Sequence, residues 1–324
     1  MAASEFEIIR RYFTPAEPGR GDVIAGVGDD AALLAVPSGT ELVVCMDTLV
    51  AGVHFPNATA PAAIGYKALA VNLSDLAAMG AEPAWVTLSV TLPDNDTDWL
   101  EQFSRGFFEL ASRYNVQLVG GDITQGPLSI TVQAHGFVPA GKALHRQGAR
   151  PGDLVCVTGS LGDAGLALHL GLTGDAALRR RLDYPQPRIE AGIALRDYAS
   201  AAIDISDGLL ADLGHLLEAD ALGASLRVDD LPCSADFLSA LDTVGPGSES
   251  LACDLKLSAG DDYELCFCIP EQQRAAMEAA LATIPCTVTA VGVIGEEPGI
   301  RCYRKDGSLY TPSTAGYQHF NAAG

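Results

Sequence analysis

The chain has 324 residues, of which 48% are hydrophobic and 19% are charged, a composition typical of one large or two medium globular domains. Its 41 acidic and 20 basic residues give a formal net charge of −21. Such a surface repels nucleic acid and anionic membranes, so we expect neither as a partner.

The cysteines and the N-terminal segment indicate where the protein is located. Eight cysteines are scattered without a CxxC pair, and several alternate with apolar residues, so we expect reduced core residues. The first residues carry acids and lack a long apolar run, and no later run approaches the length of a bilayer. We therefore expect no signal peptide, no membrane span and a cytoplasmic protein.

Predicted helices and strands alternate along the first half of the chain. Apolar residues recur at helical spacing near the N-terminus, after Pro61 and after Asp96, whereas β-branched or alternating runs indicate strands. The predicted helices span 5–13, 62–79 and 97–114, and the predicted strands span 41–47, 85–92, 116–119 and 128–138. The Pro/Gly-containing stretch 149–153 predicts a boundary between domains at 1–149 and 150–324.

The second half repeats this pattern and predicts an α/β or α+β fold in both domains. The predicted strands span 154–158, 201–205, 226–231, 263–269 and 287–294, and the predicted helices span 163–170, 188–198, 209–219 and 271–283. Asp306-Gly307 lies between two β-like runs and predicts a hairpin.

One segment resembles a phosphate-binding loop but lacks features that such a loop needs. The segment 136–143, GFVPAGKA, fits GxxxxGK[ST] until Ala143, where the Mg²⁺-binding hydroxyl is missing. No helix is predicted after it, and a P-loop needs helix-start N–H groups aimed at phosphate. We interpret the match as accidental.

Acids at the ends of apolar runs are the more informative pattern. Asp47 closes an apolar strand, and similar acid-bearing junctions occur at 28–30, 72–75, 120–122, 204–207 and 260–262. Aspartate is a hard oxygen ligand that Mg²⁺ prefers, and such clusters hold metal together with substrate phosphates. For Asp75 alone, a capping or solvated acid stays open as an alternative.

Several of these junctions also carry a family resemblance. The segments are GVGDDAALL (26–34), MDTLVAGVHF (46–55), YKALAVNLSDLAAMGAEPAW (66–85), GGD (120–122), AIDISDGLLADLGH (202–215), GDDYELCF (260–267) and GYQHF (316–320). In this order they resemble the thiamine-monophosphate kinases, which belong to the superfamily of aminoimidazole ribonucleotide synthetase. The resemblance covers nearly the whole chain.

The resemblance implies a two-domain fold and an activity. The expected reaction is ATP-dependent phosphorylation of thiamine monophosphate to thiamine diphosphate, the last step of thiamine diphosphate biosynthesis, by direct in-line transfer assisted by several Mg²⁺ ions. The N-terminal domain would bind metal and ATP and would pair with a second copy in a homodimer. The C-terminal domain would complete the active site. The acceptor phosphate is already anionic at neutral pH, so no general base is expected.

The resemblance also implies roles for individual residues. The expected Mg²⁺ ligands are Asp30, Asp47, Asp75, Asp122, Asp204 and Asp207. ATP would contact Gly121, Asp122, Arg146 and Ser206. Thiamine monophosphate would contact His54, Asp261 and Tyr317.

The sequence departs from the family pattern in two places. Cys45 and Met46 replace the usual Ser or Thr hydroxyls, and Asp261 stands where many members have Glu. Two alternatives stay open. One is a ring-forming ligase of the same superfamily, and the other is an acidic Mg²⁺- or nucleotide-binding protein without turnover.

Overall fold

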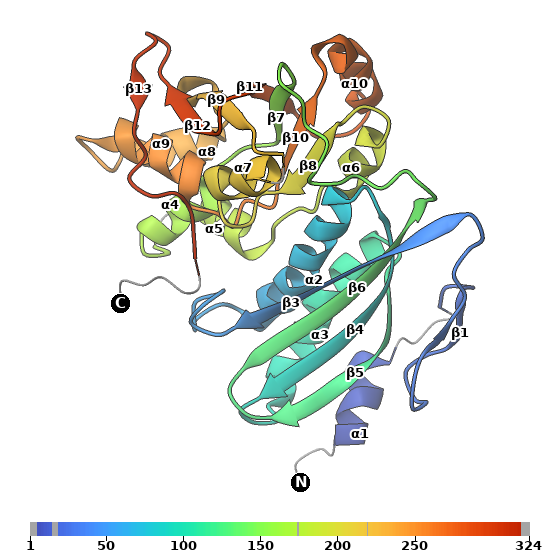
Figure 1. Cartoon of the computed structure of the whole chain (residues 1–324). Helices are drawn as coiled ribbons and strands as arrows, with labels where there is room; N and C mark the ends of the chain where they lie inside the picture. Colours follow the sequence, from blue (N-terminus) through green and yellow to red (C-terminus); the bar gives the residue numbers. More distant parts are fainter. Residues whose placement is uncertain (1–4, 15–18, 174, 219, 319–324) are drawn as a thin grey trace. The chain divides into compact units, whose positions relative to one another are not determined.

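The structure, a computed structural model, describes residues 5–14, 19–173, 175–218 and 220–318 (Figure 1). The chain divides into two units. The N-terminal unit is Met1–Leu76 with Ala81–Gly141, and the C-terminal unit is Ala77–Gly80 with Lys142–Gly324. The division precedes the 149–153 stretch used for the sequence-based boundary. No helix in the described part of the chain has the length and apolar character needed to cross a membrane.

A four-stranded sheet in the order β3-β6-β4-β5 forms the N-terminal unit, and α2 and α3 cover one of its faces (Figure 1). β4 pairs parallel with β5, and the other pairs are antiparallel. The strands are β3 Thr40–Val50, β4 Glu82–Leu92, β5 Gln117–Gln125 and β6 Ser129–Pro139, with a short pair β1 Val23–Ala25 and β2 Leu33–Leu34. The helices are α1 Glu5–Ile8, the π-helix η1 Ile9–Phe13, α2 Pro61–Ala78 and α3 Thr97–Arg113.

Local sequence explains where these helices begin and why they pack closely. Pro61 starts α2, where its missing N–H costs nothing, and the Asp96 side chain caps α3 by accepting from two backbone N–H groups. A Cβ at Gly65 would lie 2.1 Å from the carbonyl oxygen of Phe103. Glycine therefore allows the backbones of α2 and α3 to approach. The three helices predicted in this half are confirmed.

A seven-stranded mixed sheet in the order β13-β12-β9-β11-β7-β10-β8 forms the C-terminal unit. Only β12 and β9 pair in parallel among these strands of the described chain. The strands are β7 Leu154–Thr158, β8 Ala201–Asp204, β9 Gly223–Arg227, β10 Leu265–Ile269, β11 Val288–Gly295, β12 Gly299–Tyr303 and β13 Leu309–Tyr310. The helices are α4 Asp163–His169, α5 Ala176–Asp183, α6 Ile189–Leu195, α7 Leu209–Glu218, α8 Ala235–Leu241, α9 Ser248–Ser258 and α10 Arg274–Leu281, with 3₁₀ turns η2 Val228–Asp230 and η3 Glu271–Gln273.

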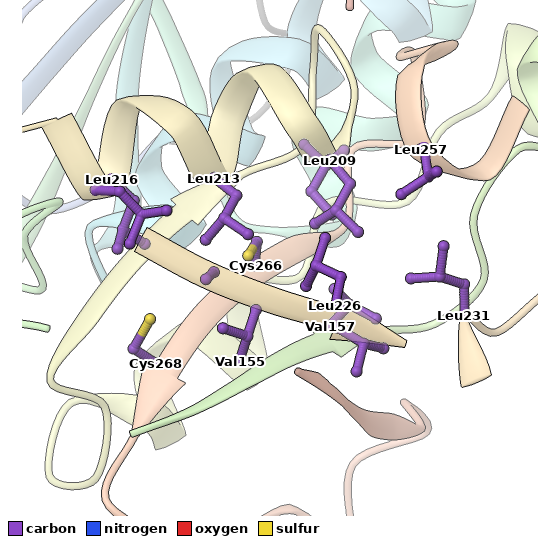
Figure 2. Packing of buried hydrophobic residues seen from close by; sticks show 14 of the residues in the cluster. Val155, Val157, Leu209, Leu213, Leu216, Leu226, Leu231, Leu257, Cys266 and Cys268 are labelled. Carbon is purple, nitrogen blue, oxygen red and sulfur yellow. The ribbon is translucent and has the colours of Figure 1, made fainter. Parts of the chain in front are cut away.

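The main core of this unit lies between α7 and the sheet (Figure 2). Leu209, Leu213 and Leu216 point from one side of α7 onto β-strand side chains that include Val157 and Cys266. All eight cysteines are free, and five of them are buried, as the alternating sequence pattern predicted.

The mixed sheets with helices confirm the predicted α/β (α+β) class, with corrections in detail. The predicted strand at 226–231 is confirmed only for Leu226 and Arg227, because η2 begins at Val228. The strand predicted from 263 begins at Leu265, because Tyr263 has φ +50. Helices α5, α8 and α9 were not predicted. No helix follows the P-loop-like segment, whose first residues belong to β6.

Candidate active site

One cavity of about 540 Å³ in the N-terminal unit brings together three of the predicted residues, Asp30, Gly121 and Asp122. Asp30 comes from the 28–32 segment, and the other two come from the edge strand β5. A Cβ at Gly121 would lie 1.8 Å from the carbonyl oxygen of Leu88. Only glycine fits there, so β5 can pack against β4 and still present Asp122 to the cavity.

Asn72 organises a second cluster, where β3 meets α2. Its Oδ1 accepts from the backbone N–H of Asp47 at 3.1 Å, and its backbone oxygen accepts from Sγ of Cys45 at 3.3 Å. Asp75 lies three residues along α2, on the same helix face and half-buried. The structure therefore places Asp47 and Asp75 at one junction. Sequence reasoning missed Asn72 itself, although it lies within the quoted NLSD motif.

The two clusters lie on opposite faces of the sheet. Asp122 pairs with Ser89, Ser89 pairs with Thr131 and Thr131 pairs with Thr48, so these side chains share one face. Asp47 precedes Thr48 in β3 and therefore points to the other face. Because β3 and β5 are opposite edges of four strands, about 14 Å also separates them. Within one N-terminal unit, Asp47 and Asp122 cannot ligate the same ion.

His54 lies in the tight loop after β3. Its Nδ1 accepts from the backbone N–H of Val50 at 2.9 Å. A neutral imidazole that accepts at one ring nitrogen carries its proton on the other. The loop therefore holds His54 in the tautomer that presents Nε2–H as a donor, on a half-buried side chain.

In the C-terminal unit, the turn between β8 and α7 is held by Asp212. One carboxylate oxygen, Oδ2, accepts from the backbone N–H groups of Ser206 at 3.0 Å, Asp207 at 3.0 Å and Gly208 at 3.1 Å. Burial, with the nearby charges of Asp204 and Asp207, raises the pKa of Asp212 to about 7. The sequence signal for this residue was an acid in the first turn of a helix rich in leucine.

Two further segments are attached to the carbonyl side of the same turn. The backbone N–H of Asp261 donates to the Ser206 oxygen at 2.8 Å, and that of Tyr317 donates to the Asp207 oxygen at 3.0 Å. Asp261 has φ +60, an unfavourable value for a non-glycine residue that these contacts maintain. The structure thus brings together Ser206, Asp207, Asp261 and Tyr317, and Asp204 ends the adjoining strand β8.

The remaining predicted residue, Arg146, lies exposed on the segment after β6. The neighbouring His145 oxygen accepts from the backbone N–H of Ala202 in β8 at 2.8 Å, which fixes this segment beside β8. His319 and Phe320, the last residues of the GYQHF motif, lie outside the described residues.

Comparisons with known proteins identify the family of the chain. The family models "AIR synthase related protein", N-terminal and C-terminal domains, match residues 28–138 and 150–305. The thiamine-monophosphate kinase of Salmonella typhimurium is 48% identical, with 99% of each chain covered, and that of Haemophilus influenzae is 40% identical at the same coverage. The chain belongs to the thiamine-monophosphate kinase family.

Solved structures extend the comparison to the fold of this family. The thiamine-monophosphate kinase of Stenotrophomonas maltophilia aligns with a TM-score of 0.82 at 44% identity, covering 90% of this chain and 93% of that one. The structure of AaThiL complexed with AMPPCP and TMP aligns with a TM-score of 0.77 at 31% identity, covering 91% and 92%. The hydrogenase maturation protein HypE, at 19% identity and a TM-score of 0.73, shares the fold alone.

The departures from the family pattern have a geometric consequence in this chain. Cys45 and Met46 are neighbours in β3, so their side chains point to opposite faces. Cys45 faces α2 and donates to Asn72, whereas Met46 is 63% exposed on the other face. The two departures from the family pattern therefore lie on opposite faces of the sheet.

Two buried acids near the Asp261 turn were not predicted. Glu264 accepts from Thr158 Oγ1 at 2.7 Å, Arg181 Nη2 at 2.9 Å and Arg188 Nε at 2.5 Å. Asp262 accepts from the Gly162 N–H at 2.9 Å, while its Oδ2 is buried with no partner among the described residues. Burial raises the pKa of Asp262 well above its usual range. In this member of the thiamine-monophosphate kinase family, both acids therefore stabilise the structure near the candidate site.

Within residues 5–14, 19–173, 175–218 and 220–318, no group of three or more His, Cys, Asp or Glu side chains is gathered around one point to hold an ion. The aspartates instead occur in small sets, each composed of carboxylates that suit Mg²⁺ chemically. The Mg²⁺ assignments therefore stay predictions.

Proposed function

We propose that the chain is an ATP-dependent kinase that phosphorylates thiamine monophosphate to thiamine diphosphate. The observation that carries this proposal is similarity along the whole chain, at up to 48% identity among the relatives described above, to proteins named for that activity. The structure of a relative with the same fold is a complex with AMPPCP, an ATP analogue, and TMP. The relatives described above are named for the kinase activity, which favours it over the ring-forming ligase of the same superfamily.

The proposed site chemistry follows from the substrates. The acceptor phosphate has a second pKa of about 6, so it is anionic at neutral pH and needs no general base. Bound Mg²⁺ would neutralise the charge of the two phosphate groups as they approach. We assign it to the carboxylates Asp30, Asp47, Asp75, Asp122, Asp204 and Asp207. We assign ATP to Gly121, Asp122, Arg146 and Ser206.

The acceptor residues match the chemistry of thiamine monophosphate. His54 presents Nε2–H, a donor suited to a phosphate oxygen. Asp261 provides a negative charge for the thiazolium cation, and the Tyr317 ring, 45% exposed, provides an aromatic surface for it. Because one turn holds Asp261 and Tyr317 beside Ser206, donor and acceptor groups would be positioned by shared backbone contacts.

We also infer a homodimer that uses the open face of the four-stranded sheet. Leu42, Val44 and Met46 alternate along β3 with 42%, 47% and 63% of their surface exposed. An exposed apolar row of this kind is typical of an interface. Pairing through this face would bring residues of a second copy near Asp122. Asp47 points to the other face of the sheet and would lie outside this interface.

We also propose a role for each of the two domains. The N-terminal domain, 1–149, would bind metal and ATP and form the dimer, and the C-terminal domain, 150–324, would complete the site. We infer a cytoplasmic location, because the eight cysteines are free and five of them belong to the core.

An ATP-consumption assay tests the function. ADP should form with thiamine monophosphate and Mg²⁺, and little should form with free thiamine, whose neutral hydroxyl must lose a proton. ATP binding without ADP formation would favour the binding-protein alternative. Comparable rates with free thiamine and thiamine monophosphate would mean that the acceptor has been misassigned.

A further inference from the structure

Asp212 has no role in the residue assignments above, yet its side chain binds the backbone of the turn that carries Ser206 and Asp207. Asp212 is 3% exposed, and its Oδ2 accepts hydrogen bonds from three consecutive backbone N–H groups at 3.0, 3.0 and 3.1 Å. These three groups precede α7, so no carbonyl of that helix is available to them. Without this oxygen, three donors would lose their acceptor, and that of Gly208 is buried.

The opposite side of the same turn is also bonded. The Ser206 oxygen accepts from Asp261, and the Asp207 oxygen accepts from Tyr317. Glycines allow this crowding, because a Cβ at Gly260 would lie 2.5 Å from the Ser206 oxygen and one at Gly316 would lie 2.9 Å from the Asp207 oxygen. The turn therefore lies between Asp212, which binds its N–H groups, and two segments that bind its carbonyl groups. These two segments carry Asp261 and Tyr317, the residues proposed to bind thiamine monophosphate.

We propose that Asp212 is a positioning residue that fixes the 206–208 turn. It thereby sets the position of Ser206, assigned to ATP, relative to Asp261 and Tyr317, assigned to thiamine monophosphate. The proposal rests on the proposed function for the identity of the ligands. It adds to the proposed function, because the Asp212 carboxylate would align the two substrates without contacting either of them. Its loss should weaken the binding of both substrates.

The test compares Asp212→Ala with Asp212→Asn. Alanine removes the acceptor, whereas asparagine keeps an oxygen of the same geometry. In Asp212→Ala, the affinities for Mg²⁺-AMPPCP and for thiamine monophosphate should each fall by about tenfold or more, as expected when several buried donors lose their acceptor. Asp212→Asn should restore both affinities to within a few fold of wild type. Calorimetric titration of the whole chain gives both values without turnover.

Hydrogen exchange provides the direct structural readout. The amides of Ser206, Asp207 and Gly208 should be protected in the wild type and in Asp212→Asn, and should exchange much faster in Asp212→Ala. Asp153→Ala is the matched control. Asp153 is a buried acid of the same unit that accepts from the Arg150 N–H at 3.0 Å and from Ser200 Oγ at 2.6 Å. It should lower the melting temperature and leave both affinities unchanged.

Distinct outcomes separate the two proposals. If folded Asp212→Ala loses stability like Asp153→Ala while both affinities stay within twofold of wild type, the positioning role is wrong. If Asp212→Ala does not fold, Asp212→Asn decides, and loss of amide protection or affinity in that folded variant would overturn the role of the acceptor oxygen. If the wild type fails to phosphorylate thiamine monophosphate, the proposed function fails, whereas amide exchange still tests Asp212.

Discussion

Glu264 offers the most quantitative test of how the C-terminal unit is held together. Its carboxylate is completely buried and accepts from Arg181, Arg188 and Thr158. In Glu264→Ala, Arg181 keeps Asp163 at 3.4 Å as an ionic partner, so Arg188, whose side chain is 12% exposed, is affected most. Removing one member of a buried ion pair costs about 3–5 kcal/mol because the other charge loses its ion-pair partner.

This loss converts to a measurable change in melting temperature. For a unit of this size, each kcal/mol corresponds to about 2–4 °C, so Glu264→Ala should lower the melting temperature by about 6–20 °C. Differential scanning calorimetry at neutral pH measures this change. Glu278→Ala is the matched control, because it breaks an exposed pair with Arg274 at 2.9 Å and should leave the melting temperature close to that of the wild type.

A double variant sharpens the test. Replacing both Glu264 and Arg188 by Met removes the two charges together, so part of the loss should be recovered. Equal melting temperatures for Glu264→Ala and Glu278→Ala would refute the reasoning. So would a double variant less stable than Glu264→Ala, because the cost would then lie in packing and not in an isolated charge.

Three other changes probe the site. Burial raises the pKa of Asp262, so the folded protein favours the protonated carboxyl group. The free energy of unfolding therefore falls as the pH rises above 3.8, the ordinary pKa of this group in the unfolded chain. Asp262→Asn, which keeps an acceptor for Gly162, should therefore lose less melting temperature than wild type from mildly acidic to mildly alkaline pH, and equal slopes would contradict this. Tyr317→Ala should weaken thiamine monophosphate binding, with a cation–π loss of up to about 2 kcal/mol, and leave ATP affinity unchanged; equal weakening of both would indicate a structural role. Asp47→Asn and Asp75→Asn should each abolish transfer in a folded protein, and near-normal turnover at saturating Mg²⁺ would exclude them as ligands.

Most of the strands and longer helices could be predicted because each carries its own pattern. α2 has Pro61 at its start and apolar residues throughout, and α3 has the Asp96 cap. Helices α5 and α8 also begin at side-chain caps, Asp175 and Ser234, but were not predicted. Leu178 and Phe237 in these helices are buried in one shared cluster, so tertiary packing stabilises them. Local sequence does not contain that information.

The start of β10 shows a different limit of the sequence. The run from Tyr263 to Ile269 reads as one strand, but Asp261 and Tyr263 have positive φ values. Their backbone N–H groups donate to the oxygens of Ser206 and Ile205, at 2.8 Å in each case. Contacts with a segment more than fifty positions earlier therefore determine this backbone conformation, which the residue types alone disfavour.

The candidate site shows why acids next to glycines were recognised and yet could not be sorted by role. Asp207 and Asp212 both lie near Gly208, and Asp261 and Asp262 both follow Gly260. Hydrogen bonding separates the members of each pair. Asp212 and Asp262 direct an oxygen to backbone N–H groups and are buried, whereas Asp207 and Asp261 use their backbone groups in the turn and remain partly exposed. An acid whose oxygen already accepts from the backbone is a poor candidate for a metal ligand, because binding an ion would break the contacts that hold the loop. The distinction between ligand and support therefore depends on which atoms each acid uses, and only the folded chain provides that information.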